Sequence, residues 1–263
     1  MRFSLPLLCV VAATRAFGVA QTNEPGALAA AQQHFYSARF QEAAAAALPL
    51  TKSGSVRLAA CEVRTSALHF QIKRLLNDGT SSGKSFKQCK ECPALLDAFM
   101  KDLTSCKTLA RAQLKTSPQS VMDLFYLGKL DSNYVWLQLS TLGKRTGWSE
   151  YWNARHSMDA VLKMNPSNIR ARVARAWIDY IVDTRVPFGM QWVLGGGDKK
   201  RGLKTVMDAS AQPVADRFVH AEAGFALWEM LVQEKRRPEA LEVAKRLLAD
   251  FPENQDLLRF VKG

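Results

Sequence analysis

Apolar residues recur at helical spacing along most of the chain. Alternation of apolar and polar residues, which marks a half-buried strand, is missing over any useful length. The clearest segment is 168–183, where Val173 and Trp177 fall on one side and Arg172 and Arg175 on the other. Such a division is typical of an amphipathic helix. The pattern therefore predicts an all-α fold.

Proline, glycine and short polar stretches divide the chain into expected helices. We expect a flexible loop near 78–88, where polar residues and glycine accumulate. Ser149 and Asp198 are expected N-caps, because their side chains can accept hydrogen bonds from the free amides of a helix start. The expected helices span residues 25–37, 40–50, 55–77, 93–117, 119–142, 149–164, 168–183, 199–210, 214–234, 238–250 and 253–262.

Three of these segments share one spacing of small and apolar residues. In each, a small residue stands four positions before a second packing residue, and in two of them a proline closes the segment. Short helices in pairs with such a recurring frame indicate a helical repeat. The three frames are Arg39-Phe40-x2-Ala43-x3-Ala47, Tyr151-x2-Ala154-x3-Met158-x7-Pro166 and Pro238-Glu239-Ala240-x3-Ala244-x7-Pro252.

This spacing resembles that of the tetratricopeptide repeat, which places a small alanine, a larger apolar residue and a terminal proline at these offsets. Leu127-Gly128 matches the Leu-Gly element of its first helix, and Trp177 matches an aromatic position. Trp228 departs from the family pattern, because a small residue is expected there, and residues 68–148 fit poorly. The resemblance implies an irregular α-solenoid of antiparallel helix pairs that forms one domain over residues 21–263.

Residues 1–20 have the pattern of a signal peptide. Arg2 precedes an apolar stretch, and the small residues Gly18-Val19-Ala20 precede the expected cleavage after Ala20. The stretch is too short to span a bilayer, and no later run of about 18 apolar residues exists. We therefore expect an exported protein, located in the bacterial periplasm or secreted, with no integral membrane segment.

The chain is basic, with a formal net charge of +12. Loss of the expected signal peptide removes two arginines and no acidic residue, so the mature domain stays strongly basic. An exported protein rarely meets nucleic acid, so we expect no nucleic-acid partner and interpret the charge as a solvated basic surface.

Four cysteines follow the expected signal peptide: Cys61, Cys89, Cys92 and Cys106. Disulfides are stable in an oxidising compartment, and four cysteines allow three complete pairings, between which the sequence does not choose. Cys89 and Cys92 form a CxxC, and Pro93 marks a helix start that would favour a thiolate. Structural bridges are the favoured interpretation. Redox activity of the CxxC is the alternative, although the strand context of a thioredoxin-like domain is missing.

The chain contains no HExxH, GxSxG or GxxxxGK[ST] motif, and its four histidines stand in separate segments. We expect no catalytic residue, no metal site and no cofactor. The run from Gly195 to Arg201 holds three glycines, Asp198 and three cations, which could bind an anion at a helix start. The favoured interpretation is a tight turn capped by Asp198.

Aromatic residues concentrate in one part of the chain, because five of the six tryptophans lie between positions 136 and 192. Charged residues are interleaved with them. Aromatic walls with a few orienting charges are typical of a binding groove, whereas packing between helices is the alternative. The candidate groove residues are Asp131, Tyr134, Trp136, Arg145, Trp148, Trp152, Arg155, Asp179, Arg185 and Trp192.

A non-enzymatic binding protein is the function that these features favour. The aromatic-rich concave surface of a helical repeat suits a protein or peptide partner. An export signal ahead of irregular helix pairs is also similar to the solute-binding T-component of some bacterial TRAP transporters. That similarity implies a small periplasmic ligand as the alternative to a protein partner.

Overall fold

The computed structural model describes residues 24–52, 54–76, 86–144, 146–185, 191 and 193–263. These residues form helices and turns, with no strand among them. The expected signal peptide and most of the expected loop near 78–88 lie outside the described residues. The end of that loop, Phe86–Gln88, forms a short 3-10 turn, η2.

The described helices follow the expected segments closely. The α-helices are α1 (Glu24–Tyr36), α2 (Phe40–Ala47), α3 (Arg57–Leu76), α4 (Cys92–Thr116), α5 (Val121–Trp136), α6 (Trp148–Met164), α7 (Ile169–Arg185), α8 (Lys199–Ser210), α9 (Arg217–Gln233), α10 (Arg237–Asp250) and α11 (Gln255–Lys262). A 3-10 turn, η1 (Pro49–Thr51), follows α2, and a π-helical segment, η3 (Leu137–Thr141), follows α5.

Local chemistry explains most of the helix ends. Pro93 stands in the first turn of α4, where a missing amide proton costs nothing. Asp198 caps α8 by accepting from the Arg201 amide, as expected. The expected N-cap at Ser149 is wrong. Helix α6 begins one residue earlier, because Gly147 adopts a left-handed conformation (φ 96°) that turns the chain into the helix.

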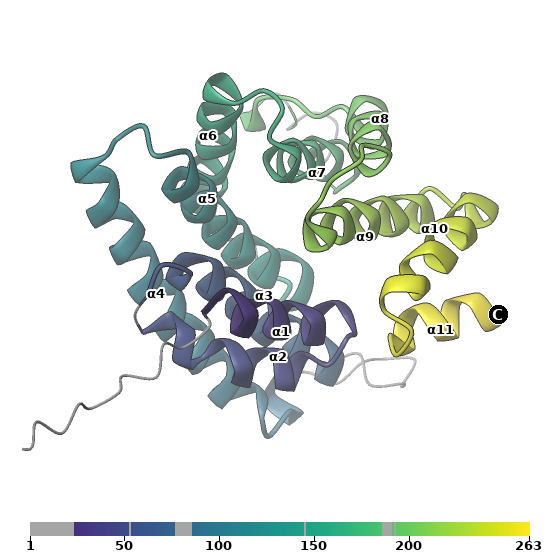
Figure 1. Ribbon diagram of the computed structural model, residues 1–263, viewed down its shortest axis with the longest axis horizontal. Coiled ribbons are helices and arrows are strands. Elements are labelled where there is room, and N and C mark those ends of the chain that lie inside the picture. Colours follow the sequence, from purple (N-terminus) through teal and green to yellow (C-terminus); the bar gives the residue numbers. More distant parts are fainter. Residues whose placement is uncertain (1–23, 53, 77–85, 145, 186–190, 192) are drawn as a thin grey trace, which may run out of the picture.

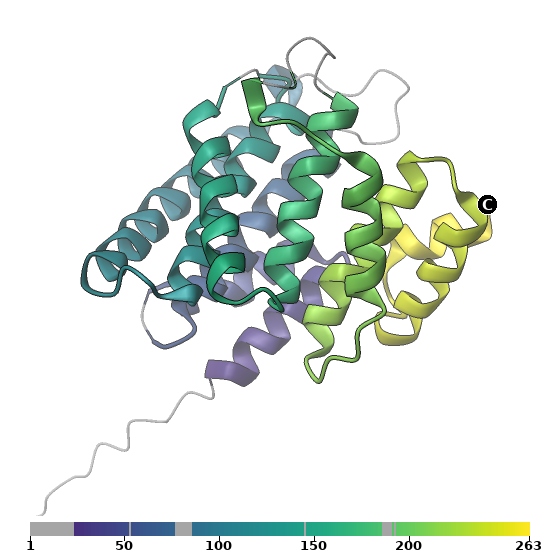
Figure 2. The same cartoon turned by 90° about the horizontal axis from the view of Figure 1, so that it is seen from above.

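Helices adjacent in the chain pack against each other in successive pairs (Figure 1). Seen from above, α6, α7 and α8 lie side by side with their axes roughly aligned (Figure 2). The recurring frame predicted the packing positions correctly. All six of its small or apolar residues are buried, namely Ala43, Ala47, Ala154, Met158, Ala240 and Ala244.

Gly128 lets α5 and α6 approach closely. A Cβ atom at this position would lie 2.9 Å from Ser157 Cβ and 2.8 Å from Met158 Cε. The Leu-Gly element identified in the sequence therefore works here as a packing site between two helices of a pair.

The hydrophobic core is divided along the chain. One cluster unites residues of α2, α3, α4 and α5, and a second unites residues of α7 to α11. Smaller clusters join α5, α6 and α7 between them. Most of the packing therefore joins helices that lie close together in the chain.

The last helices contact the first. Asn254, the N-cap of α11, donates to the Tyr36 carbonyl at 2.7 Å. The Tyr36 ring lies 5.4 Å from that of Phe251. Ion pairs of 3.0 Å and 2.8 Å join Arg39 to Glu253 and Arg74 to Asp256. We call this group of interactions the terminal contact.

None of the helices that the structure describes is long and apolar enough to cross a membrane.

Candidate functional site

Exposed apolar side chains gather at one end of α5, α6 and α7. Leu139 follows α5, Trp148 begins α6, and both are exposed, by 45% and 51%. Val193 is 47% exposed and precedes Leu194, whose carbonyl accepts a 2.8 Å hydrogen bond from Tyr151 of α6. We call Leu139, Trp148 and Val193, together with the half-buried Trp152 of α6, the aromatic edge.

Arg155 of α6 fixes the loop beside this edge. Its guanidinium donates to the carbonyls of Leu194, Gly195 and Gly196 at 3.2, 2.9 and 3.3 Å. It also lies 6.0 Å from the centre of the Trp152 ring. Arg155 is 9% exposed, so its charge is directed into the protein rather than toward a ligand.

The loop of Gly195, Gly196 and Gly197, here the glycine loop, is occupied by groups of the protein itself. The Lys199 amide, which begins α8, donates to the Asp183 carboxylate at 2.8 Å, and the Asp198 amide donates to the Asp179 carbonyl at 3.2 Å. The loop carbonyls point to Arg155, as described above. The turn interpretation of this segment therefore fits the geometry, and the start of α8 already holds a carboxylate where an anion would bind.

Asp179 is a hub for arginine side chains. It is 6% exposed and pairs with Arg155 at 3.7 Å and with Arg201 at 3.3 Å. Arg175, one helical turn earlier, pairs with it as well. These pairs join α6, α7 and α8 directly behind the aromatic edge, so they hold that edge in one geometry.

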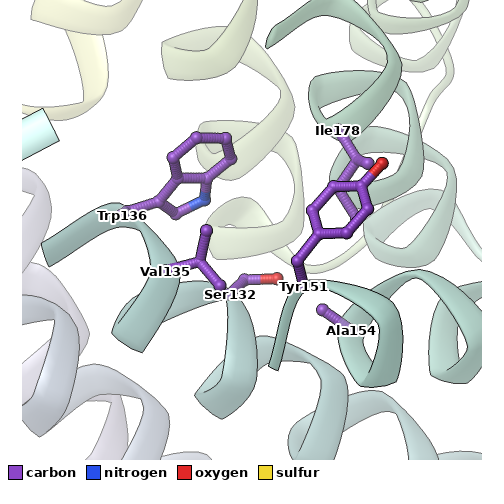
Figure 3. A pocket seen from close by; sticks show the side chains of 6 residues that line it. All are labelled: Ser132, Val135, Trp136, Tyr151, Ala154 and Ile178. Carbon is purple, nitrogen blue, oxygen red and sulfur yellow. The ribbon is translucent and has the colours of Figure 1, made fainter. Parts of the chain in front are cut away.

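A small apolar cavity lies where α5, α6 and α7 meet (Figure 3). Trp136 and Tyr151 stand on opposite sides of it, with Val135 and Ser132 between them and Ala154 next to Tyr151. Its volume is about 10 Å³, the space of one water molecule. A second cavity, between α8, α9 and α10, has about 20 Å³. Pockets for drug-sized ligands are typically several hundred Å³.

The structure brings together five of the ten candidate groove residues. Trp136, Trp148, Trp152, Arg155 and Asp179 lie at or directly behind the aromatic edge.

Of the other candidates, Arg185 is exposed at the same end of the helices as the aromatic edge, and the rest lie elsewhere or outside the described residues. Tyr134 packs against the N-terminal core cluster. Asp131 is fully buried and pairs with Lys107 of α4. Burial raises the pKa of Asp131 more than the Lys107 charge lowers it. Arg185 is exposed at the end of α7. Arg145 and Trp192 fall outside the described residues.

Two disulfides use all four candidate cysteines. Cys61 bridges to Cys106, joining α3 to α4, and Cys89 bridges to Cys92 at the start of α4. Cys89 is 7% exposed and Cys92 is fully buried. Thiol exchange requires an attacking thiolate to reach a sulfur atom. The burial of this pair therefore favours a structural bridge.

Sequence reasoning missed a buried ionic cluster that joins four helices. We call Glu62, Lys129, Arg170 and Glu222, on α3, α5, α7 and α9, the inner cluster. Lys129 Nζ lies 2.7 Å from Glu222 and 3.5 Å from Glu62. Arg170 pairs with Glu222 through Nε and lies 3.4 Å from Glu62 through Nη2. These side chains are 10–19% exposed.

The electrostatics of the inner cluster favour a structural role. Burial would raise the pKa of Glu222, but the charges of Arg170 and Lys129 outweigh it and lower the pKa to about 2. The pKa of Lys129 is raised, because Glu222 and Glu62 outweigh its burial. A proton-transfer group works best when its pKa is near the working pH. Both shifts move away from neutrality and keep the groups charged.

The histidine, cysteine, aspartate and glutamate side chains in the described part of the chain form no group of three or more suited to hold a metal ion. Comparison with protein-family models, with curated proteins and with solved structures finds no match to this chain.

Proposed function

We propose that this chain is an exported, irregular tetratricopeptide-like repeat protein that binds a protein partner through the aromatic edge and catalyses no reaction. The observation that carries the proposal is the exposure of Trp148, Leu139 and Val193 at one end of α5, α6 and α7. Large exposed apolar groups that lie together on a monomer mark interaction surfaces. Tryptophan is also among the residues that contribute most binding energy at interfaces.

The scaffold behind the edge supports this role. Arg155 and Asp179 anchor the glycine loop and three helices, so the exposed side chains are presented from a rigid base. A surface that is already ordered loses less conformational entropy on binding. The two disulfides agree with an oxidising compartment, as expected for an exported protein.

The charge around the edge favours a partner segment that is apolar and acidic. Lys144, Arg185 and Lys200 are exposed near this end of the helices, and the whole chain carries a net charge of +12. Complementary charge steers association and selects partners. The small volumes of the two cavities favour a protein segment over a small ligand.

Site-specific photocrosslinking tests this proposal. A photoreactive phenylalanine analogue at Trp148 should capture a partner from the exported fraction of the source cells. The same analogue at Met122 is the matched control, because Met122 is 62% exposed but stands at the other end of α5. Equal capture at both positions, or none at Trp148, would count against the aromatic edge.

A further inference from the structure

The terminal contact is made by a few side chains at turns and helix ends. Tyr36 and Arg39 flank the turn between α1 and α2, and Arg74 stands near the end of α3. They meet Phe251 to Asp256, the turn between α10 and α11. The side chains of both ion pairs are 37–62% exposed, so water screens these pairs.

Neither of the two main core clusters extends across this contact. The N-terminal cluster draws its buried residues from positions 38–137, and the C-terminal cluster from positions 173–257. The N-terminal half (α1 to α6) and the C-terminal half (α7 to α11) therefore each keep a core of their own when the contact separates. Besides the two ion pairs and the Asn254–Tyr36 hydrogen bond, a small aromatic group joins the halves at the contact, namely Tyr36 with Phe218, Phe225 and Phe251.

The inner cluster lies close to this aromatic group, because Glu222, Arg170 and Glu62 all act electrostatically on the Tyr36 hydroxyl. It also divides evenly between the halves. Glu62 pairs with Lys129 inside the N-terminal half, and Arg170 pairs with Glu222 inside the C-terminal half. Opening breaks the two pairs that cross between the halves, Lys129 with Glu222 and Arg170 with Glu62. No charge is left without a partner, which removes the largest penalty for separating buried ions.

From these observations we propose that the terminal contact is a reversible latch with a closed and an open state, and that the open state exposes the inner cluster. The movement pivots where α6 meets α7, on the other side of the molecule from the contact (Figure 1). This proposal is independent of the aromatic edge, which lies outside the latch.

Lysine acylation measures the opening directly. The Lys129 side chain is 17% exposed in the closed state, with its Nζ held by Glu222 and Glu62, and it becomes accessible when the halves separate. Lys107 is the internal control: it stands on α4, its side chain is 10% exposed, and it pairs with Asp131 of α5 inside the N-terminal half. The full chain is treated with an N-hydroxysuccinimide acetate under native conditions, and each lysine is quantified by mass spectrometry.

The double variant Tyr36→Ala, Asn254→Ala removes the aromatic contact and the hydrogen bond of the latch. Lys129 should be acylated about tenfold faster than in the unaltered chain, as expected when a minor open state becomes the major one. Lys107 should keep its rate. A parallel rise at both lysines would mean general unfolding and would overturn the latch.

A locked variant covers the case in which the first variant does not fold. Arg39→Cys and Glu253→Cys place two exposed thiols across the contact, and the native cysteines of the folded domain are held in disulfides. Cys9→Ser removes the remaining thiol. A short bismaleimide crosslink should slow acylation of Lys129 below that of the unlinked chain. An unchanged rate would show that no opening occurs, and the proposal would fall.

Discussion

His69 of α3 is a buried histidine that the fold holds in its neutral form. Its Nε2 lies 2.8 Å from the hydroxyl of Thr141 in the π-helical segment η3. Burial and, to a smaller extent, the charge of Lys73 lower the pKa of His69 to about 3. The unfolded chain binds a proton at this side chain at about pH 6.5, so protonation favours unfolding.

The folded state should therefore lose stability as the pH falls from about 6.5 toward about 3, by up to about 1.4 kcal/mol per pH unit from this group. His69→Gln keeps a hydrogen-bonding group for the Thr141 hydroxyl and removes the titration. The free energy of unfolding, measured in urea between pH 7 and pH 4, should fall less steeply in this variant.

The matched control is His156→Gln, because His156 is exposed. Carboxylates such as Glu222 also contribute to the pH dependence of stability in both variants. The contribution of His69 is therefore the difference between the two slopes of unfolding free energy against pH. Identical slopes for both variants would contradict the assigned role.

Gly197 is required for space rather than for backbone freedom. A Cβ atom here would lie 2.5 Å from the Asp183 amide nitrogen and 2.7 Å from the Asp179 carbonyl oxygen. Gly197→Ala should lower the free energy of unfolding by about 1–3 kcal/mol, the usual cost of overpacking. A Cβ atom at Gly196 would meet no atom within 4 Å, but the backbone there has φ +73°. Gly196→Ala should therefore lower the free energy of unfolding by only about 1 kcal/mol. Thermal unfolding of the two variants compares them, and equal losses would refute the steric explanation.

At the scale of the elements, the disulfide between α3 and α4 is expected to stabilise the fold more than the one at the start of α4. Cys61 and Cys106 are 45 residues apart, whereas Cys89 and Cys92 are 3 apart. Chain-entropy arguments give about 4 kcal/mol for the longer loop and about 2 kcal/mol for the shorter one.

The double variant Cys61→Ala, Cys106→Ala should therefore unfold at a lower urea concentration than the double variant Cys89→Ala, Cys92→Ala. Its loss in free energy of unfolding should be roughly twice as large. The second pair serves as the control for removing two sulfur atoms. The reverse order would show that strain or unfolded-state structure, rather than loop length, governs these bridges.

The helices could be predicted from sequence because proline, glycine and capping residues mark their ends. Besides the start of α6, the largest departure is at the end of α5. The expected helix ran to residue 142, and the α-helix ends at Trp136 before the π-helical segment. Residues 137–141 continue the helical pattern of apolar residues, and the tertiary bond from His69 to Thr141 is invisible to local reasoning.

The candidate site was predicted only in part for a similar reason. Aromatic density located the region, but exposure decides which side chains form a surface, and only the packing shows that Trp148 is exposed while Tyr134 contributes to the core. The inner cluster is marked in the sequence by charged residues inside apolar segments. Glu62 stands in the otherwise apolar run 59–63, and Lys129 interrupts an apolar segment of the next helix pair. A charge inside an apolar face predicts a buried partner without identifying it.

At the scale of the whole molecule, the positive net charge should make the binding of the partner depend on salt concentration. With a net charge of +12 and exposed cations near the aromatic edge, partner binding should weaken as ionic strength rises, mainly through a slower association rate. Surface plasmon resonance at low and high salt measures it. Lys144→Gln, Lys200→Gln should reduce the salt dependence, and an unchanged dependence would place the electrostatic contact elsewhere.

The central claim is that the aromatic edge binds a protein partner. Its most direct test uses the partner that photocrosslinking identifies. The dissociation constant of that partner is measured by calorimetry for two single variants of the chain. Trp148→Ala should weaken binding at least about tenfold, because truncating a central tryptophan of an interface costs more than about 1.4 kcal/mol. Met122→Ala, which removes an even more exposed apolar side chain at the other end of α5, should leave the constant unchanged. Equal affinities for both variants would contradict the account.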